Sequence, residues 1–228
     1  MEKNQKLYLH QLVHSLSTSE KGYIKKYCSK NGTNKTYLNL LDAIDQQAVY
    51  DEKALKTQFK GEKFVRQFSV AKNYLTRTIL KSLRVYHAES TNNIRIHEHL
   101  LDIEFQYKKR LVGLCEKMIK KTRRLIEESQ LYHHASELAF WEFRLLLLSL
   151  HDKHIDQAML ENYQFDQTTT VYNQQLTLYR HLAYQVFVPS IRTGNSQSPE
   201  VLAIAQQLSL DPLLQAPPSP QNAKALAR

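Results

Sequence analysis

The feature that most constrains this chain is the placement of its prolines, because all six lie at or after residue 189. Proline removes a backbone donor and clashes with the preceding turn of a helix, so its absence from residues 1–188 permits long uninterrupted helices. Glycine is also sparse, and Gly32, Gly61 and Gly113 stand between apolar-periodic segments, where helices end. Apolar residues recur at steps of three and four, and the sequence therefore predicts an all-α protein.

Five helices are expected in the N-terminal part of the chain, around residues 7–16, 17–27, 37–44, 51–59 and 62–89. Ser17 with Glu20 three residues later has the pattern of a capping box, and Asp51 that of an N-cap. The last helix is the longest, at about 40 Å for a rise of ~1.5 Å per residue. Its apolar stripe is Phe64, Phe68, Ala71, Leu75, Ile79, Leu83 and Tyr86.

The polar break at residues 91–93 precedes three amphipathic helices around residues 96–111, 114–126 and 131–148, with a tight turn near Gly113. The apolar spacing of Ile96, Leu100 and Ile103 recurs 35 residues later. Such a period, with two helices per unit, is typical of a tetratricopeptide array, whose helical hairpins stack to bury their apolar faces. A fourth helix along residues 172–186 is expected to pack behind the third.

These patterns predict three parts. Residues 1–89 form an N-terminal helical segment that ends in the long basic amphipathic helix. Residues 92–188 form tetratricopeptide-like helical hairpins. Residues 189–228 hold a polar loop, one short helix near residues 199–208 and a flexible proline-rich tail.

Four segments carry a resemblance to a known family: residues 12–21 (LVHSLSTSEK), 37–45 (YLNLLDAID), 68–75 (FSVAKNYL) and 79–83 (ILKSL). The chain resembles a family of uncharacterised helical-repeat proteins from Bacteroidota, over about residues 7–128. The resemblance implies a tetratricopeptide-like α-array, usually within a longer chain with further repeats. It implies no activity, cofactor or catalytic residue.

Charge is unevenly placed along the chain, which has a formal net charge of +9. Residues 1–128 hold 25 basic and 14 acidic residues, whereas residues 129–228 hold 6 and 8. On a helical wheel five of the six basic residues of the long helix fall within about 60° of one another, opposite its apolar stripe: Lys63, Arg66, Arg77, Lys81 and Arg84. A second basic cluster lies at residues 108–124. The candidate partner-binding residues are Lys63, Arg66, Arg77, Lys81, Arg84, Lys120 and Arg124.

Three interpretations of this basic surface remain open: a solvated face, a site for an acidic protein partner, and a surface that follows nucleic-acid phosphates. No helix-turn-helix, RNA-binding aromatic motif or zinc finger supports the last. We therefore expect a non-enzymatic interaction scaffold that holds a protein partner, with a nucleic-acid-associated protein as the alternative.

Metal and catalytic chemistry have little support in the sequence. Ten histidines include the close pairs His10/His14 and His133/His134, but none completes a His-Glu-x-x-His motif or brings a third ligand with it, so no metal site is predicted. Cys115 belongs to an apolar stripe, whereas Cys28 is expected to be partly exposed without a paired base. No phosphate loop or nucleophile elbow occurs. We expect no enzyme activity, cofactor or small-molecule substrate, although an enzyme with an unrecognised site stays open.

Two further expectations concern packing and location. Tyr107 and Trp141 are the aromatic pair most suited to contact a ligand, yet interhelical packing is their expected role. The first 13 residues lack the apolar run of a secretory signal, and residues 145–148 fall far short of the ~20 apolar residues of a membrane span. A cytoplasmic protein without membrane association is expected.

Overall fold

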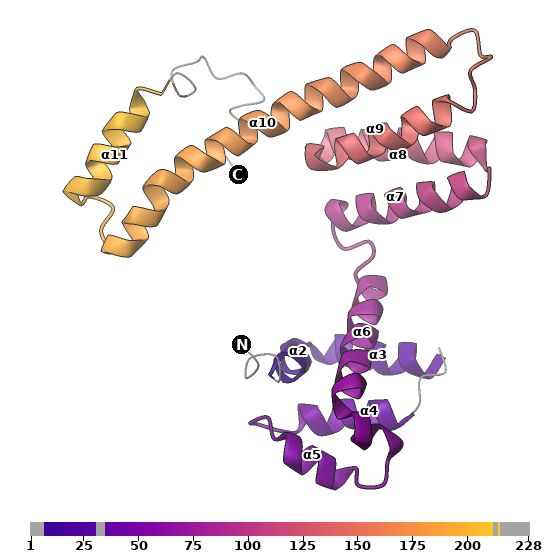
Figure 1. Ribbon diagram of the computed structural model, residues 1–228, viewed down its shortest axis with the longest axis vertical. Coiled ribbons are helices and arrows are strands. Elements are labelled where there is room, and N and C mark those ends of the chain that lie inside the picture. The colour runs from indigo at the N-terminus through magenta and orange to yellow at the C-terminus, as the bar shows by residue number, and fades with distance from the viewer. Residues whose placement is uncertain (1–6, 31–34, 212–213, 215–228) are drawn as a thin grey trace. The chain divides into compact units, whose positions relative to one another are not determined.

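Helices make up all the regular structure in the computed structural model, which describes residues 7–30, 35–211 and 214, and no strand occurs among these residues (Figure 1). None of the described helices is long and apolar enough to span a membrane. Contacts divide the chain into two units, Met1–Ile94 and Arg95–Arg228. The division falls in the first turn of α7 (Asn92–Lys108). This turn adjoins the polar break at residues 91–93, where the sequence predicts a boundary.

Unit 1 is built around one long helix, α6, which packs against α2, α3 and α4. The face that α6 turns inward carries Phe68, Ala71, Leu75 and Ile79, all of them buried. The elements of this unit are α2 (Tyr8–Ser15), α3 (Thr18–Lys30), α4 (Lys35–Asp45), α5 (Glu52–Gln58), the 3-10 turn η1 (Lys63–Gln67) and α6 (Phe68–Tyr86).

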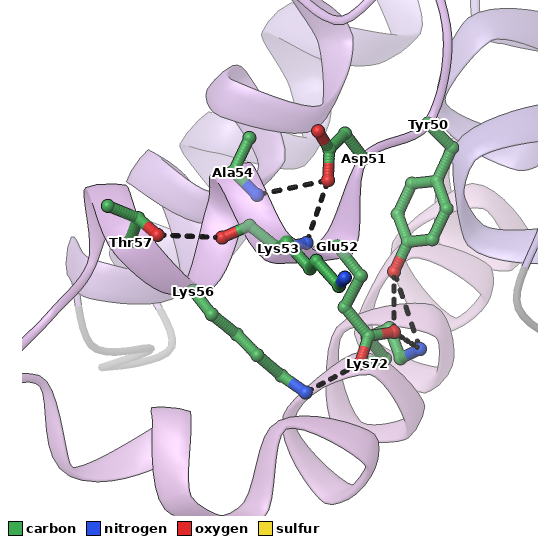
Figure 2. A network of polar contacts seen from close by, with 8 residues as sticks. All are labelled: Tyr50, Asp51, Glu52, Lys53, Ala54, Lys56, Thr57 and Lys72. Carbon is green, nitrogen blue, oxygen red and sulfur yellow. Dashed lines mark hydrogen bonds and ion pairs between the residues drawn. The ribbon is translucent and has the colours of Figure 1, made fainter.

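Both helix starts expected from capping residues are confirmed. At α3 the Glu20 backbone N–H donates to the Ser17 hydroxyl at 3.2 Å, and the Ser17 N–H donates to the Glu20 carboxylate at 2.7 Å. At α5 the Asp51 carboxylate accepts from the N–H groups of Lys53 and Ala54 at 2.8 and 3.0 Å (Figure 2). These side chains satisfy donors that have no partner within the first turn of a helix.

The long helix expected over residues 62–89 is shorter in the structure. Residues 63–67 form the 3-10 turn η1, and Gln67, at φ −125° and ψ 49°, lies outside the α-helical region. This path places the Phe64 ring 5.5 Å from Phe59 and 5.9 Å from Tyr37, between centroids. At the other end Tyr86 is 41% exposed, so the apolar stripe is buried only over its middle turns.

Unit 2 holds a second core, formed where α7, α8, η2, α9 and the first half of α10 meet. Ile96 and Ile103 of α7, Ile126 of α8 and Leu138 of α9 are completely or almost completely buried there. The elements are α7 (Asn92–Lys108), α8 (Val112–Ser129), the 3-10 turn η2 (Tyr132–His134), α9 (Ala135–Leu146), α10 (Ile155–Thr193) and α11 (Pro199–Ser209) (Figure 1).

The turn after α7 is closed by Arg110 and not by a glycine. Gly113, expected in the turn after α7, lies in the first turn of α8; Arg110 instead takes the left-handed conformation, with φ 60°. The Leu111 N–H then donates to the Gln106 carbonyl at 3.0 Å, which closes the end of α7. Gly61 does occupy a positive φ, at 106°, after α5. Gly32 lies outside the described residues.

Pro189 does not end α10, contrary to the expectation of a polar loop from residue 190. The helix continues to Thr193, and Gly194 with φ 64° caps it. Proline removes one backbone hydrogen bond, and hydroxyls support the last turns: Ser190 donates to the Val186 carbonyl at 2.8 Å and Thr193 to the Pro189 carbonyl at 3.0 Å. The short helix expected after Pro199 is confirmed as α11. The expected flexible tail falls mostly outside the described residues.

The buried face of α6 generates a stability prediction. Leu75→Ala should lower the free energy of unfolding of unit 1 by about 2–5 kcal/mol, because it leaves a cavity in the core. Leu80→Ala is the matched control on the same helix, since Leu80 is 42% exposed, and it should change the value by less than about 0.5 kcal/mol. The buried Cys28 thiol provides the measurement: its labelling rate in urea, read by peptide mass, reports the opening of this unit. Equal effects of the two substitutions would contradict the assigned face.

Candidate functional site

The clearest basic surface of the described residues lies on the outer side of α6. Arg77, Lys81 and Arg84 are exposed, follow one another at steps of four and three, and stand opposite Leu75 and Ile79. None of the three forms an ion pair with a described residue. We call these three residues the α6 basic face.

The other candidate residues do not extend this face. Lys63 and Arg66 are exposed, but they lie on η1, so the helical wheel that aligned them with Arg77 does not apply. Lys120 and Arg124 are exposed on α8 in unit 2. The structure therefore divides the predicted stripe into three groups: one on α6, one on η1 and one on α8.

Lys72 is another basic residue of α6, but its ammonium group is bonded inside unit 1. Its Nζ donates to the Glu52 carboxylate at 2.7 Å and to the Tyr50 hydroxyl at 3.4 Å (Figure 2). The same ammonium lies 5.6 Å from the centroid of the Phe68 ring, and the side chain is only 14% exposed. Lys72 joins α5 to α6 and is unavailable to a partner.

Glu52 is the centre of this network, because Lys56 also donates to its carboxylate, at 2.7 Å (Figure 2). Partial burial alone would raise the pKa of Glu52, but the bonds from Lys56 and Lys72 outweigh burial and lower it to about 2. Burial raises the pKa of Tyr50, and the neighbouring Glu52 charge adds to that rise. The carboxylate is thus held in its ionised form at neutral pH.

The acidic residues of unit 1 are largely occupied in the same way. Asp45 pairs with Lys21 at 2.7 Å, Asp42 with Lys25 at 2.6 Å, and Glu20 with His87 at 2.7 Å. The hydrogen bond from His87 is the main cause that lowers the pKa of Glu20. Because these described carboxylates are bonded within the unit, they do not pair with the exposed cations of α6.

The basic residues of α8 are likewise divided between those exposed to solvent and one that is bonded inside the unit. Lys117, Lys120, Lys121 and Arg124 are exposed at steps of three, one and three, whereas Arg123 is turned inward. The Arg123 guanidinium donates to Glu142 of α9 and lies 3.8 Å above the Phe165 ring of α10. No pattern in the sequence predicts this bridge, because its three members come from three helices.

The histidines pack against one another and against the backbone. The rings of His10 and His14 lie 4.2 Å apart, and His10 Nε2 is 2.8 Å from the Gln47 carbonyl. In unit 2 the His134 ring lies 4.0 Å from His133 and 4.5 Å from His97. No group of three or more His, Cys, Asp or Glu side chains in the described part of the chain is arranged to hold a metal ion.

Burial lowers the pKa of His134 to about 4, and the charges of His133 and His97 act in the same direction. His134 is 4% exposed. Burial also lowers the pKa of His99 and of His133. These rings are therefore neutral at pH 7, and their protonation opposes folding of unit 2.

The remaining candidates behave as packing residues. Cys115 is buried as expected, and burial raises the pKa of its thiol. The expectation that Cys28 is partly exposed is wrong, since this residue of α3 is completely buried. The Tyr107 and Trp141 rings lie 5.7 Å apart, and the Arg144 guanidinium covers Tyr107 at 4.7 Å. This pair joins α7 to α9.

No protein-family model, curated protein or solved structure matches this chain. Function must therefore be inferred from the surfaces described above.

The Glu52 network generates a prediction for unit 1. Glu52→Gln should lower its free energy of unfolding by about 1–3 kcal/mol at pH 7, because the half-buried Lys72 loses its counter-charge. Glu62→Gln is the matched control, since Glu62 is exposed and has no ion pair among the described residues. Urea denaturation followed by far-ultraviolet circular dichroism measures both.

The lowered pKa of Glu52 also predicts how its contribution to stability changes with pH. A carboxylate with a lowered pKa stabilises the folded state fully above its unfolded pKa of 4.5, and this contribution is lost as the pH falls towards about 2. The difference between wild type and Glu52→Gln should shrink over that interval. A difference that stays constant would show that the carboxylate charge is not the cause.

The histidine cluster generates a prediction for unit 2. Because the pKa of His134 is lowered from 6.5 to about 4, its contribution is complete above pH 6.5 and falls by up to about 3 kcal/mol as the pH drops towards 4. The fluorescence of Trp141, the single tryptophan of the sequence and part of this core, reports unfolding of the unit. His134→Phe should flatten the pH profile. An unchanged slope would exclude His134 as the titrating group.

Proposed function

We propose that this protein is a non-enzymatic interaction scaffold whose α6 basic face binds an acidic segment of a protein partner. The observation that carries the proposal is the exposure of Arg77, Lys81 and Arg84 without counter-ions on a helix whose opposite side is fixed in a core. Packing requires the apolar side of α6, but it requires no cations on the outer side.

The surroundings of the face favour a protein segment. Val70 is 61% exposed and Leu80 42%, and both lie beside the three cations on the outer side of α6. A partner that offers carboxylates together with small apolar side chains would match both features. Tyr74 is not free for base stacking, because its ring lies 4.6 Å from Tyr37.

We further propose that α7 to α9 form a tetratricopeptide-like array. Three successive helices with short connections and a shared core support this arrangement, as does the 35-residue spacing of their apolar residues. The chain departs from a regular repeat at α10, whose 39 residues exceed the length of a repeat helix. The resemblance to Bacteroidota helical-repeat proteins agrees with the array and adds no activity.

A second candidate function is association with nucleic acid. The observation that favours it is the additional exposed row on α8, with Lys117, Lys120, Lys121 and Arg124. Such a row could follow a phosphate backbone, and its binding would carry no base specificity.

A direct binding measurement separates these candidates. The full chain is titrated into a fluorescein-labelled decapeptide of alternating Glu and Ala, and separately into a labelled 20-base-pair duplex, at two salt concentrations. Arg77→Glu/Lys81→Glu should weaken peptide binding by about tenfold or more, because each reversal adds a repulsive contact. Lys26→Glu/Lys53→Glu is the matched control, since both lysines are exposed elsewhere on unit 1.

The outcomes differ clearly between the two functions. Equal losses in both double variants would show that net charge alone attracts the peptide, and the α6 basic face would be discarded. Preferential binding of the duplex, with log affinity falling linearly against log salt and a loss on Lys120→Glu/Arg124→Glu, would favour nucleic acid. Circular dichroism of each variant confirms that it is folded.

A further inference from the structure

One side of α10 is covered by the rest of unit 2 along the first half of the helix. Asn162 is buried, and its Nδ2 donates to the Ala139 carbonyl of α9 at 3.1 Å. Thr169 is also buried, and Asn173 Nδ2 donates to the Tyr132 carbonyl of η2 at 2.9 Å. These residues identify the side of α10 on which α9 and η2 pack.

The same side of α10 is exposed along the second half of the helix. An α-helix returns to the same direction after 18 residues, which make five turns. The residues 18 positions after Asn162, Thr169 and Asn173 are Arg180, Phe187 and Ile191. All three are exposed, Phe187 by 64% and Ile191 by 63%. The side of α10 that α9 and η2 cover therefore continues as an exposed surface.

This exposed surface is mostly apolar and carries a groove. Ala183, Phe187 and Ile191 follow one another at steps of four, and we call these three residues the α10 apolar stripe. Ala183 and Phe187 line an open groove together with Arg180 and Tyr184. The helix α11 packs against a neighbouring side of α10, where Val188 and Leu208 line a separate pocket (Figure 1). A contiguous exposed apolar patch with a polar rim is typical of a protein interaction site.

The charge around the stripe distinguishes between possible occupants. Arg180 lies one turn before the stripe on the same side of α10, and it forms no ion pair with a described residue. Residues 167–199 contain two arginines, one histidine and no aspartate or glutamate. A second copy of this chain would bring these cations together without a carboxylate, and like charges across an interface oppose association. A partner that carries carboxylates is favoured.

We propose that the α10 apolar stripe binds an amphipathic helix of a partner protein, with its apolar side on Phe187 and Ile191 and a carboxylate against Arg180. A helix is the matching element because the helix α9 packs on the same side of α10, and the stripe continues that interface.

The spacing along α10 suits such a helix. Arg180 and Phe187 are seven residues apart, which is two turns and about 10 Å along the axis. Two residues of the occupant that are also seven positions apart lie on one side of it, so one can pair with Arg180 while the other packs on Phe187. The stripe belongs to unit 2 and the α6 basic face to unit 1, so each proposal can fail without the other.

The test is fluorescence polarisation of the full chain with a labelled amphipathic peptide of 18 residues. The peptide carries leucines at steps of three and four, glutamates beside them and alanine elsewhere. Phe187→Ser/Ile191→Ser should weaken its binding by about tenfold or more, because large apolar side chains at the centre of an interface contribute most of the binding energy.

A matched control removes exposed apolar side chains from another side of the same helix. Leu178 lies nine residues before Phe187, which is two and a half turns, so it faces the opposite direction. Val171→Ser/Leu178→Ser should therefore change the affinity by less than about twofold, although both residues are exposed. Equal losses in the two double variants would overturn the proposal.

The charge of the occupant is tested by exchange. Arg180→Glu should weaken binding of the glutamate peptide and strengthen binding of the same peptide with lysine in place of glutamate. Equal binding of the two peptides to the wild type would contradict an acidic partner. Arg77→Glu/Lys81→Glu should lose less affinity than Phe187→Ser/Ile191→Ser. A loss as large would place the peptide on the α6 basic face and would overturn this inference alone.

Two further outcomes would also overturn the proposal. One is an absence of binding below about 1 mM of the glutamate peptide. The other is a dimer in sedimentation equilibrium that Phe187→Ser/Ile191→Ser converts to a monomer, since a second copy would then cover the stripe. Unchanged circular dichroism and Trp141 emission verify that each variant retains the fold.

Discussion

The helices that form the two cores bury apolar side chains against one another, and this burial is the interaction on which both units depend. In unit 1 the completely buried Leu75 and Ile79 fix the rotation of α6 about its axis. Apolar burial contributes roughly 25 cal/mol per Å². Exposing this face would therefore cost far more free energy than a surface ion pair contributes. The same rotation directs Arg77 and Lys81 to solvent, and the basic face is a consequence of the core behind it.

The second determinant is how the structure distributes charge. The sequence contains an excess of cations in its first half, but cations of one segment have different fates: Lys72 is held between Glu52 and the Phe68 ring, whereas Arg84 is left exposed. Since the described carboxylates near α6 are engaged in internal pairs, the excess appears on its outer surface. Net charge along a segment therefore overstates what is available to a partner.

Unit 2 presents a different chemistry. Its core buries two neutral imidazoles, those of His99 and His134. Acid weakens this core, because protonation of the buried His134 opposes folding.

The sequence by itself determined the helical class, the caps at Ser17 and Asp51 and the middle of the α6 stripe, because each depends on residues within a few positions of one another. It did not determine that α6 begins at Phe68, which follows from ring contacts between separate segments, or that α10 continues beyond Pro189. The Arg123 bridge combines side chains from α8, α9 and α10, so only tertiary packing brings them together. Local periodicity encodes which side of a helix is buried, whereas the neighbours on that side are decided by the packing of the whole unit.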